Sequence, residues 1–174
     1  QRVRVYREIT RKEGRTMTTY EVNPIGIIRC SEDGFFLCLD KRFIPALEGL
    51  DGFSYLQVLW WFSDFDSAPY RSVLQIEQPY KNAPERMGIF ATRSPIRPNP
   101  IGLTAVKILD LDKTEGIVRI AYIDAHDNTP ILDLKPYTPS FDRLEAPRVP
   151  DWCRHWPMSL EQSGEFNWEN EFNF

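Results

Sequence analysis

Cysteine and histidine are scarce in this chain of 174 residues, which holds three cysteines and two histidines. The cysteines are odd in number and lack the paired spacing of a zinc ligand set, so we expect free thiols in a reducing cytoplasm and no metal site. No apolar run approaches the roughly 18 residues of a transmembrane helix. No apolar segment follows the basic N-terminus, as a secretory signal would require. The sequence therefore predicts a cytoplasmic protein without a membrane span.

Several familiar motifs are absent. The chain has no G-x-G-x-x-G fingerprint, no Walker A sequence and no G-x-S-x-G nucleophile elbow. These absences argue against a Rossmann dinucleotide site, a P-loop nucleotide site and an α/β-hydrolase. His126 lies between Asp124 and Asp127, but the sequence places no serine or cysteine nucleophile beside it. A histidine in such a turn is usually solvent-facing.

Charge is unevenly distributed. The composition, 42% hydrophobic and 26% charged, is that of a globular protein, and the length fits one domain. The net charge is −4, yet residues 1–16 carry six basic and two acidic residues, and residues 151–174 carry one basic and five acidic. Residues 86–107 hold four basic residues and no acidic one. This basic island within an acidic protein is a candidate contact for phosphates.

The chain divides into three regions. Residues 1–16 precede Met17, a plausible natural start, and form an upstream extension or a cloning remnant. Residues 17–146 are predicted to form the folded domain. Residues 147–174 form an acidic aromatic tail that includes Trp152, Trp156 and Trp168. So many aromatic residues are not typical of disorder, so we expect the tail to pack on the body or on a partner chain.

Short apolar segments follow one another with no long amphipathic helix between them. The segments predicted to be strands are 21–29, 35–39, 55–62, 73–77, 87–92, 102–111, 116–124 and 131–135. The first two flank the turn Glu32-Asp33-Gly34 and are expected to form a hairpin. Residues 44–50 are expected to form a helical turn or two, and 55–62 a strand buried on both faces. In residues 116–124, Val118, Ile120 and Tyr122 should share one face. The fold class predicted is all-β, a single compact β-barrel of about seven strands with short helical turns.

Residues 86–103 contain a rigid segment. Pro95, Pro98 and Pro100 fix three backbone φ angles within six residues, so the loop has little entropy to lose on binding. Arg93 and Arg97 project from it, and a guanidinium suits carboxylates and phosphates. The alternative is a rigid surface loop whose arginines pair with acidic neighbours.

Residues 122–137 contain an aspartate-rich turn. Asp127-Asn128-Thr129-Pro130 is a turn sequence, because Asp bonds its own backbone and Asn tolerates the left-handed conformation. Asp124, Asp127 and Asp133 lie in or near this turn, and carboxylates can bind an ammonium group or act as a base. The alternative is that they cap and stabilise the turn.

Three segments together carry a resemblance. They read A-L-E-G-L-D-G-F-S at 46–54, R-M-G-I-F-A-T-R-S-P-I-R-P-N-P-I-G-L at 86–103 and D-A-H-D-N-T-P-I-L-D-L-K-P-Y at 124–137. This pattern resembles the TsaA-like family, whose best-characterised members are tRNA threonylcarbamoyladenosine N-methyltransferases, over roughly residues 24–142. The chain departs from the family pattern at Ser63 and Tyr55, where the family carries histidine, and in the short segment 30–34, where the family has a longer loop. It looks like a short member lacking the family's C-terminal domain.

The resemblance implies a barrel that binds S-adenosylmethionine outside the Rossmann framework, usually as a homodimer. It also implies methyl transfer to the modified exocyclic nitrogen of the adenosine 3′ of a tRNA anticodon. The cofactor contacts implied by position are Ser63, Asp64, Arg93, Leu103, Tyr122, Ile123, Asp124 and Ala125. In chemical terms, Leu103, Ile123 and Phe90 suit the adenine, Arg93 suits the methionine carboxylate, and Asp124 suits the ammonium or the ribose.

The basic residues predicted to contact tRNA phosphates are Arg86, Arg97, Lys107 and Lys135. Asp127 and Tyr137 are the candidates for assisting proton removal, and neither is assigned as the base. Two alternatives stay open at this point. The same barrel can methylate a small molecule or a protein, or it can bind S-adenosylmethionine as a non-catalytic module.

Overall fold

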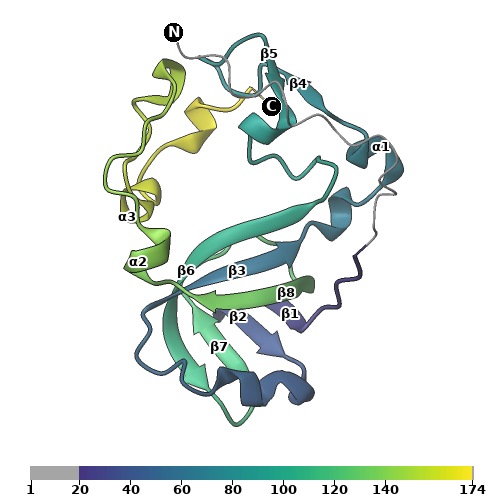
Figure 1. Ribbon diagram of the computed structural model, residues 1–174, viewed down its shortest axis with the longest axis vertical. Helices are drawn as coiled ribbons and strands as arrows, with labels where there is room; N and C mark the ends of the chain where they lie inside the picture. The colour runs from purple at the N-terminus through teal and green to yellow at the C-terminus, as the bar shows by residue number, and fades with distance from the viewer. Residues whose placement is uncertain (1–19, 174) are drawn as a thin grey trace, which may run out of the picture.

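Six strands form a closed antiparallel barrel, in the order β1-β2-β7-β6-β3-β8, in the computed structural model, which describes residues 20–173 (Figure 1). Two further strands, β4 and β5, pair with each other in a separate sheet. The strand bounds are β1 Gly26–Ser31, β2 Gly34–Leu39, β3 Tyr55–Trp61, β4 Gln75–Glu77, β5 Arg86–Gly88, β6 Ile101–Asp112, β7 Ile117–Ile120 and β8 Thr129–Pro136. The predicted all-β barrel is confirmed, with six strands in the barrel itself.

The helices are all short, as the sequence predicts. The 3₁₀ turns are η1 Lys41–Leu47, η2 Ser63–Phe65, η3 Ile89–Ala91, η4 Asp151–Cys153 and η5 Trp168–Asn170. The α-helical turns are α1 Ala68–Arg71, α2 Pro139–Asp142 and α3 Leu160–Ser163. Within residues 20–173, no helix is long and apolar enough to cross a membrane.

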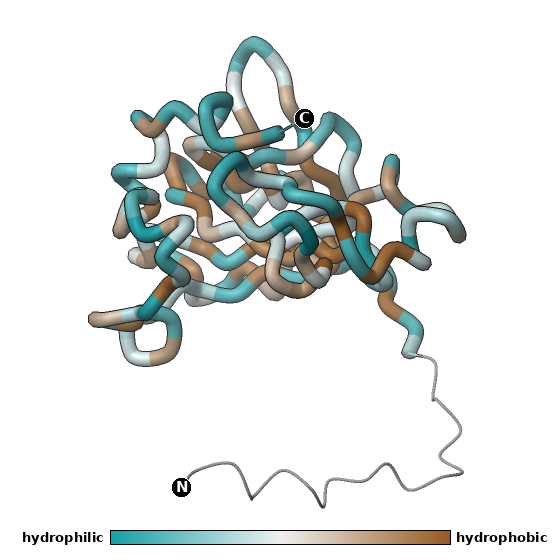
Figure 2. The backbone as a smooth tube through the Cα atoms, turned by 90° about the horizontal axis from the view of Figure 1, so that it is seen from above, coloured by the Kyte–Doolittle hydropathy of each residue, from teal (hydrophilic) through white to brown (hydrophobic). Residues whose placement is uncertain are grey.

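The core fills the inside of the barrel. Successive strand residues point to opposite faces, and on β3 the inward set Leu56, Val58 and Trp60 is buried. Trp60 lies directly over its register partner Gly102, where an added Cβ would meet the indole ring at 2.3 Å. The other fully buried members include Ile28, Leu37, Val106, Val118, Ile120, Ile123 and Ile131. The more hydrophobic segments accordingly gather toward the middle of the tube in Figure 2, with hydrophilic loops around them.

The structure corrects several strand predictions. The hairpin of β1 and β2 forms as predicted. β3, however, is not buried on both faces, because its outer residues are only half-buried. Residues 73–77 and 87–92 contribute only β4 and β5, outside the barrel, and the second continues into η3. β7 ends at Ile120, so Tyr122 does not continue its inward face: Tyr122 is 60% exposed and Ile123 enters the core instead.

Closure of the barrel depends on a short seam between β1 and β8. Only three residue pairs are in register there, Gly26 with Ile131, Ile27 with Pro130 and Ile28 with Thr129. Pro130 has no N–H to donate. Two backbone hydrogen bonds lengthen the seam, one at each end. The Ile25 N–H donates to the Ile131 carbonyl at 2.8 Å, and the Asn128 N–H donates to the Ile28 carbonyl at 2.8 Å.

The aromatic tail packs on the same chain, against the connection between β4 and β5. Tyr80 in that connection contacts Trp152, Trp156 and Phe172, with ring centroids 5.3, 5.1 and 5.9 Å away. Tyr80 and Phe172 also form an isolated antiparallel bridge. In Figure 1 the tail accordingly runs from α2 past α3 and returns beside β5.

Glu171 is a buried carboxylate at the centre of this tail. Its Oε2 accepts a hydrogen bond from Trp156 Nε1 at 3.0 Å, and its Oε1 lies 2.9 Å from His155 Nε2. The hydrogen bond from the Trp156 N–H, and to a lesser extent the one with His155, holds the pKa of Glu171 below its usual value. The ionised carboxylate therefore helps fix the tail.

Acid should release the tail. A carboxyl group whose pKa is lowered on folding stabilises the folded protein at pH values above its unfolded pKa of about 4.3. This stabilisation is lost as the pH falls through the lower pKa of the folded state. We expect Glu171→Gln to make the tail more accessible to proteases at pH 7. The variant should also lose the acid-dependent release of the tail that the wild type shows. Limited proteolysis and tryptophan fluorescence measure both effects. The control is Glu169→Gln, which removes one charge from the same turn. Equal proteolysis of both variants across the pH range would contradict this role.

Candidate functional site

One end of the barrel brings together three loop segments. The Phe62 N–H donates to the Pro100 carbonyl at 2.8 Å, so Ser63 and Asp64 begin beside the start of β6. The connection from β7 to β8, residues 121–128, reaches the same end, because β8 runs antiparallel to β3 with Ile131 opposite Trp60. The cofactor residues predicted on these segments therefore lie at a common end.

A contact between a histidine and a carboxylate links two of these segments. His126 Nδ1 lies 2.6 Å from Asp64 Oδ2, and the two side chains are 75% and 66% exposed. The pair joins η2 to the connection between β7 and β8. Sequence reasoning missed it, because the partners are 62 residues apart. The only signal was a histidine between two aspartates.

A second contact joins the proline-rich loop to β6. Arg93 Nη2 donates to the Leu103 carbonyl at 2.5 Å. Leu103 is 47% exposed, and Phe90, earlier in the same loop, is 80% exposed. Both side chains offer apolar surface to solvent, Leu103 from β6 of the barrel and Phe90 from η3. The structure thus brings two of the predicted cofactor contacts, Arg93 and Leu103, next to each other.

Ile123 departs from its expected role. Its side chain is 1% exposed and belongs to the barrel core, so a contact from Ile123 to adenine has to come from its backbone. Beside it, the Ala125 carbonyl accepts a hydrogen bond from Cys30 Sγ at 3.3 Å. Burial raises the pKa of the Cys30 thiol, and the charge of Asp127 raises it further, which keeps the thiol protonated as a donor.

Both carboxylate oxygens of Asp127 have hydrogen-bond partners. Its Oδ1 accepts the Cys30 N–H at 2.9 Å and lies 3.2 Å from Arg29 Nε, while its Oδ2 accepts from Asn128 Nδ2 at 2.8 Å. Arg29 Nη1 also donates to Asn128 Oδ1 at 2.7 Å, and Asn128 has a φ of +65°. These contacts match the alternative in which the aspartate stabilises the turn. We call Arg29, Cys30, Asp127 and Asn128 the seam clamp.

Tyr137, the other candidate for proton removal, lies elsewhere. Its N–H donates to the Tyr55 carbonyl at 2.9 Å, at the start of β3. Asp127 lies near the opposite end of the barrel, roughly 20 Å away along a strand of this length at about 3.3 Å per residue. The two candidates therefore do not share one site within the chain.

The residues predicted to contact phosphates are dispersed. Lys107 and Lys135 lie on either side of β3, opposite Tyr55 and Gln57. Lys135 pairs with Asp133 at 2.7 Å, and that hydrogen bond raises the pKa of the lysine. Arg86 lies on β5, outside the barrel.

Arg97 points into its own loop. It donates to the carbonyls of Ser94, Thr92 and Ile89 at 2.7, 2.6 and 3.4 Å. These bonds stabilise the proline-rich loop from within. The structure therefore does not bring the four predicted phosphate contacts into one patch.

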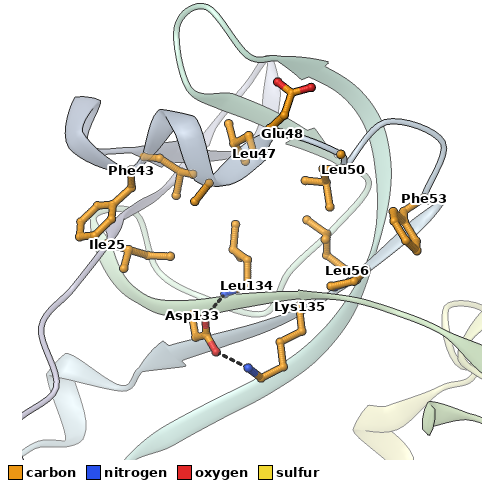
Figure 3. A pocket seen from close by; sticks show the side chains of 14 residues that line it. Ile25, Phe43, Leu47, Glu48, Leu50, Phe53, Leu56, Asp133, Leu134 and Lys135 are labelled. Atoms are coloured by element: carbon orange, nitrogen blue, oxygen red, sulfur yellow. Dashed lines mark hydrogen bonds and ion pairs between the residues drawn. The ribbon is translucent and has the colours of Figure 1, made fainter.

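A cavity of about 340 Å³ lies at the other end of the barrel, under η1 (Figure 3). Leucine side chains from η1, β3 and β8 point into it: Leu47, Leu56 and Leu134. It contains none of the residues predicted to hold the cofactor. Within residues 20–173, no group of three or more histidine, cysteine or acidic side chains is placed to hold a metal ion.

Together these features define a class of protein: a closed antiparallel barrel with candidate ligand-binding groups on the loops of one end, outside any Rossmann framework. Residues 21–143 match the model of the tRNA-methyltransferase O N-terminal domain. The chain belongs to this family, as the sequence resemblance predicts.

Relatives support this assignment. The chain is 35% identical over 130 residues to a protein of Methanocaldococcus jannaschii named a probable S-adenosyl-L-methionine-binding protein, covering 75% of this chain and 99% of the relative. It is 33% identical over 121 residues to the tRNA (adenine(37)-N6)-methyltransferase of Escherichia coli, covering 68% of this chain and 51% of that enzyme. A crystal structure of TrmO from Pseudomonas aeruginosa matches with a TM-score of 0.60 and 29% identity, covering 78% of this chain and 62% of that one. The chain thus spans about half to all of the length of these proteins.

The seam clamp predicts distinct effects of two substitutions at Asp127. Asp127→Ala removes the acceptor for the Cys30 N–H and should destabilise the protein by about 1–2 kcal/mol. Asp127→Asn keeps one acceptor oxygen for the Cys30 N–H but loses two exposed contacts, the ion pair with Arg29 and the hydrogen bond from Asn128 Nδ2, at a cost of under about 1 kcal/mol. Urea denaturation measures both. Equal losses for the two variants would show that the carboxylate charge, rather than the acceptor, holds the seam.

Proposed function

We propose that this chain is an S-adenosylmethionine-dependent methyltransferase that modifies tRNA, at the exocyclic nitrogen of the threonylcarbamoyladenosine next to the anticodon. The observation that carries the proposal is membership of the tRNA-methyltransferase O N-terminal domain family over residues 21–143. The name of the Escherichia coli relative supports the tRNA substrate, and that of the Methanocaldococcus relative supports the cofactor.

The groups at the loop end fit the chemistry of the cofactor. Phe90 and Leu103 offer exposed apolar surface for adenine, and Tyr122 offers an exposed ring. Arg93 suits the carboxylate, and Asp124 suits the ammonium group. S-adenosylmethionine supplies an activated methyl group on its sulfonium. The protein's part is to align donor and acceptor and to accept a proton from the nitrogen.

We propose further that the chain acts as a homodimer. Gly102 faces the buried Trp60, so its neighbours Ile101 and Leu103 point outward, beside Leu59 and Trp61 of β3. Ile101 and Leu103 are 38% and 47% exposed there, and exposed apolar residues that lie together on a sheet face are typical of a face that another chain covers. A second copy is the occupant that the family resemblance favours.

Sedimentation velocity tests the dimer. We expect Ile101→Glu to shift the protein from dimer to monomer, because it places a charge on the outward apolar face. The matched control is Leu160→Glu, an exposed leucine of the tail, which should leave the dimer unchanged. A wild-type protein that sediments as a monomer at micromolar concentration would contradict the proposal.

A second candidate substrate is a small molecule or a protein. The dispersion of Arg86, Arg97, Lys107 and Lys135 favours it, because a tRNA enzyme usually gathers such residues on one surface. Salt separates the candidates. Binding of tRNA should weaken steeply with rising salt concentration, whereas a barrel that acts on another substrate should bind tRNA feebly at all salt concentrations.

Mass spectrometry of tRNA tests the function directly. Purified protein, S-adenosylmethionine and tRNA carrying threonylcarbamoyladenosine should give the N-methylated nucleoside. Arg93→Ala should weaken cofactor binding by roughly ten- to a hundredfold, because it removes a charge-assisted hydrogen bond. Arg86→Ala, on the separate sheet, is the control and should bind the cofactor normally. No methylated nucleoside from the wild-type protein would exclude this substrate.

A further inference from the structure

We propose that His126 accepts the proton from the acceptor nitrogen during methyl transfer, and that Asp64 orients its ring. This inference rests on the proposed function and names a residue that the family resemblance left unassigned. Its starting observation is the 2.6 Å contact between His126 Nδ1 and Asp64 Oδ2.

The contact fixes which nitrogen is available. A carboxylate beside Nδ1 favours the tautomer that carries the proton on Nδ1, which leaves the lone pair on Nε2. The His126 side chain is 75% exposed, so a substrate can reach it from solvent. An oriented imidazole with a free acceptor nitrogen is the arrangement that general-base catalysis requires.

The position of His126 connects it to the cofactor groups. It directly follows Ala125, which ends the segment predicted to contact S-adenosylmethionine, and its partner Asp64 is a predicted contact as well. The seam clamp holds the next residue, Asp127, to β1 through the Cys30 N–H at 2.9 Å. The imidazole is therefore anchored from both sides, through its ring and through its backbone.

The other ionisable groups at this end have partners or are weaker bases. Asp127 is paired with Arg29 in the seam clamp, and the Cys30 thiol donates to Ala125. Partial desolvation of the Tyr122 hydroxyl, and after it the charge of Asp124, raises the pKa of this group, which keeps it protonated. Asp124 is exposed, but a carboxylate is in general a weaker base than an imidazole.

The exocyclic nitrogen attacks the methyl carbon, the N–C bond forms, and the C–S bond breaks with its electron pair going to sulfur. The sulfonium becomes a neutral thioether. The proton leaves the nitrogen for His126 Nε2, so the positive charge passes to the imidazolium, next to the Asp64 carboxylate that stabilises it.

Turnover of His126 variants, measured beside cofactor binding, tests this role. His126→Ala and His126→Gln should lower kcat by roughly a hundredfold or more. Both should bind S-adenosylmethionine normally by calorimetry. Added imidazole should restore part of the activity of His126→Ala, which a purely structural role would not allow.

The chain supplies a matched control. His155→Gln changes the other histidine, in the tail, and should retain the wild-type kcat. The inference is overturned if His126→Ala turns over at the wild-type rate or loses cofactor binding. If the proposed function itself is wrong, the wild-type protein methylates no tRNA, which distinguishes this result from a failure of the His126 role alone. The role of His126 is then also overturned.

Discussion

The barrel depends on how β1 and β8 are closed against each other. Three register pairs, one of them with a proline, form a weak seam, and yet the core residues Ile28 and Ile131 on these strands are fully buried. The Asp127 carboxylate lengthens the seam, because it accepts the Cys30 N–H in the place of a ladder carbonyl. The Asp127 side chain thus extends the backbone hydrogen bonding between β1 and β8. This contact fixes the connection from β7 to β8, which carries part of the candidate site.

This arrangement explains why the sequence predicts the fold better than the site. Turn residues at 32–34 and short alternating strands specify the β1–β2 hairpin locally. Barrel closure is a tertiary property, so the sequence could not show that β4 and β5 stay outside it. The position of Tyr122 was missed for a related reason: the strand ladder ends at Ile120, and the turn shifts the inward position to Ile123.

Charged residues in a motif are equally hard to assign from sequence. Arg97 and Asp127 both stand in segments that suggest ligand contacts. In the structure each satisfies backbone groups of its own surroundings: Arg97 bonds carbonyls of the proline-rich loop, and Asp127 bonds the Cys30 N–H. A rigid loop needs such internal partners, because prolines remove N–H donors that would otherwise hold it. The same rigidity presents Arg93 and Phe90 at the surface.

The exposure of the candidate site limits what can bind there. Ligand sites usually bury most of a small molecule, whereas Phe90, Leu103 and Tyr122 are 80%, 47% and 60% exposed. Side chains this open do not by themselves enclose a ligand of that size. In the proposed function, a second copy on the outer face of β3 and β6, or the bound tRNA, would complete the enclosure. Because the His126 side chain is 75% exposed, the same cover would shield its ring from water in the proposed proton transfer and would couple proton removal to binding.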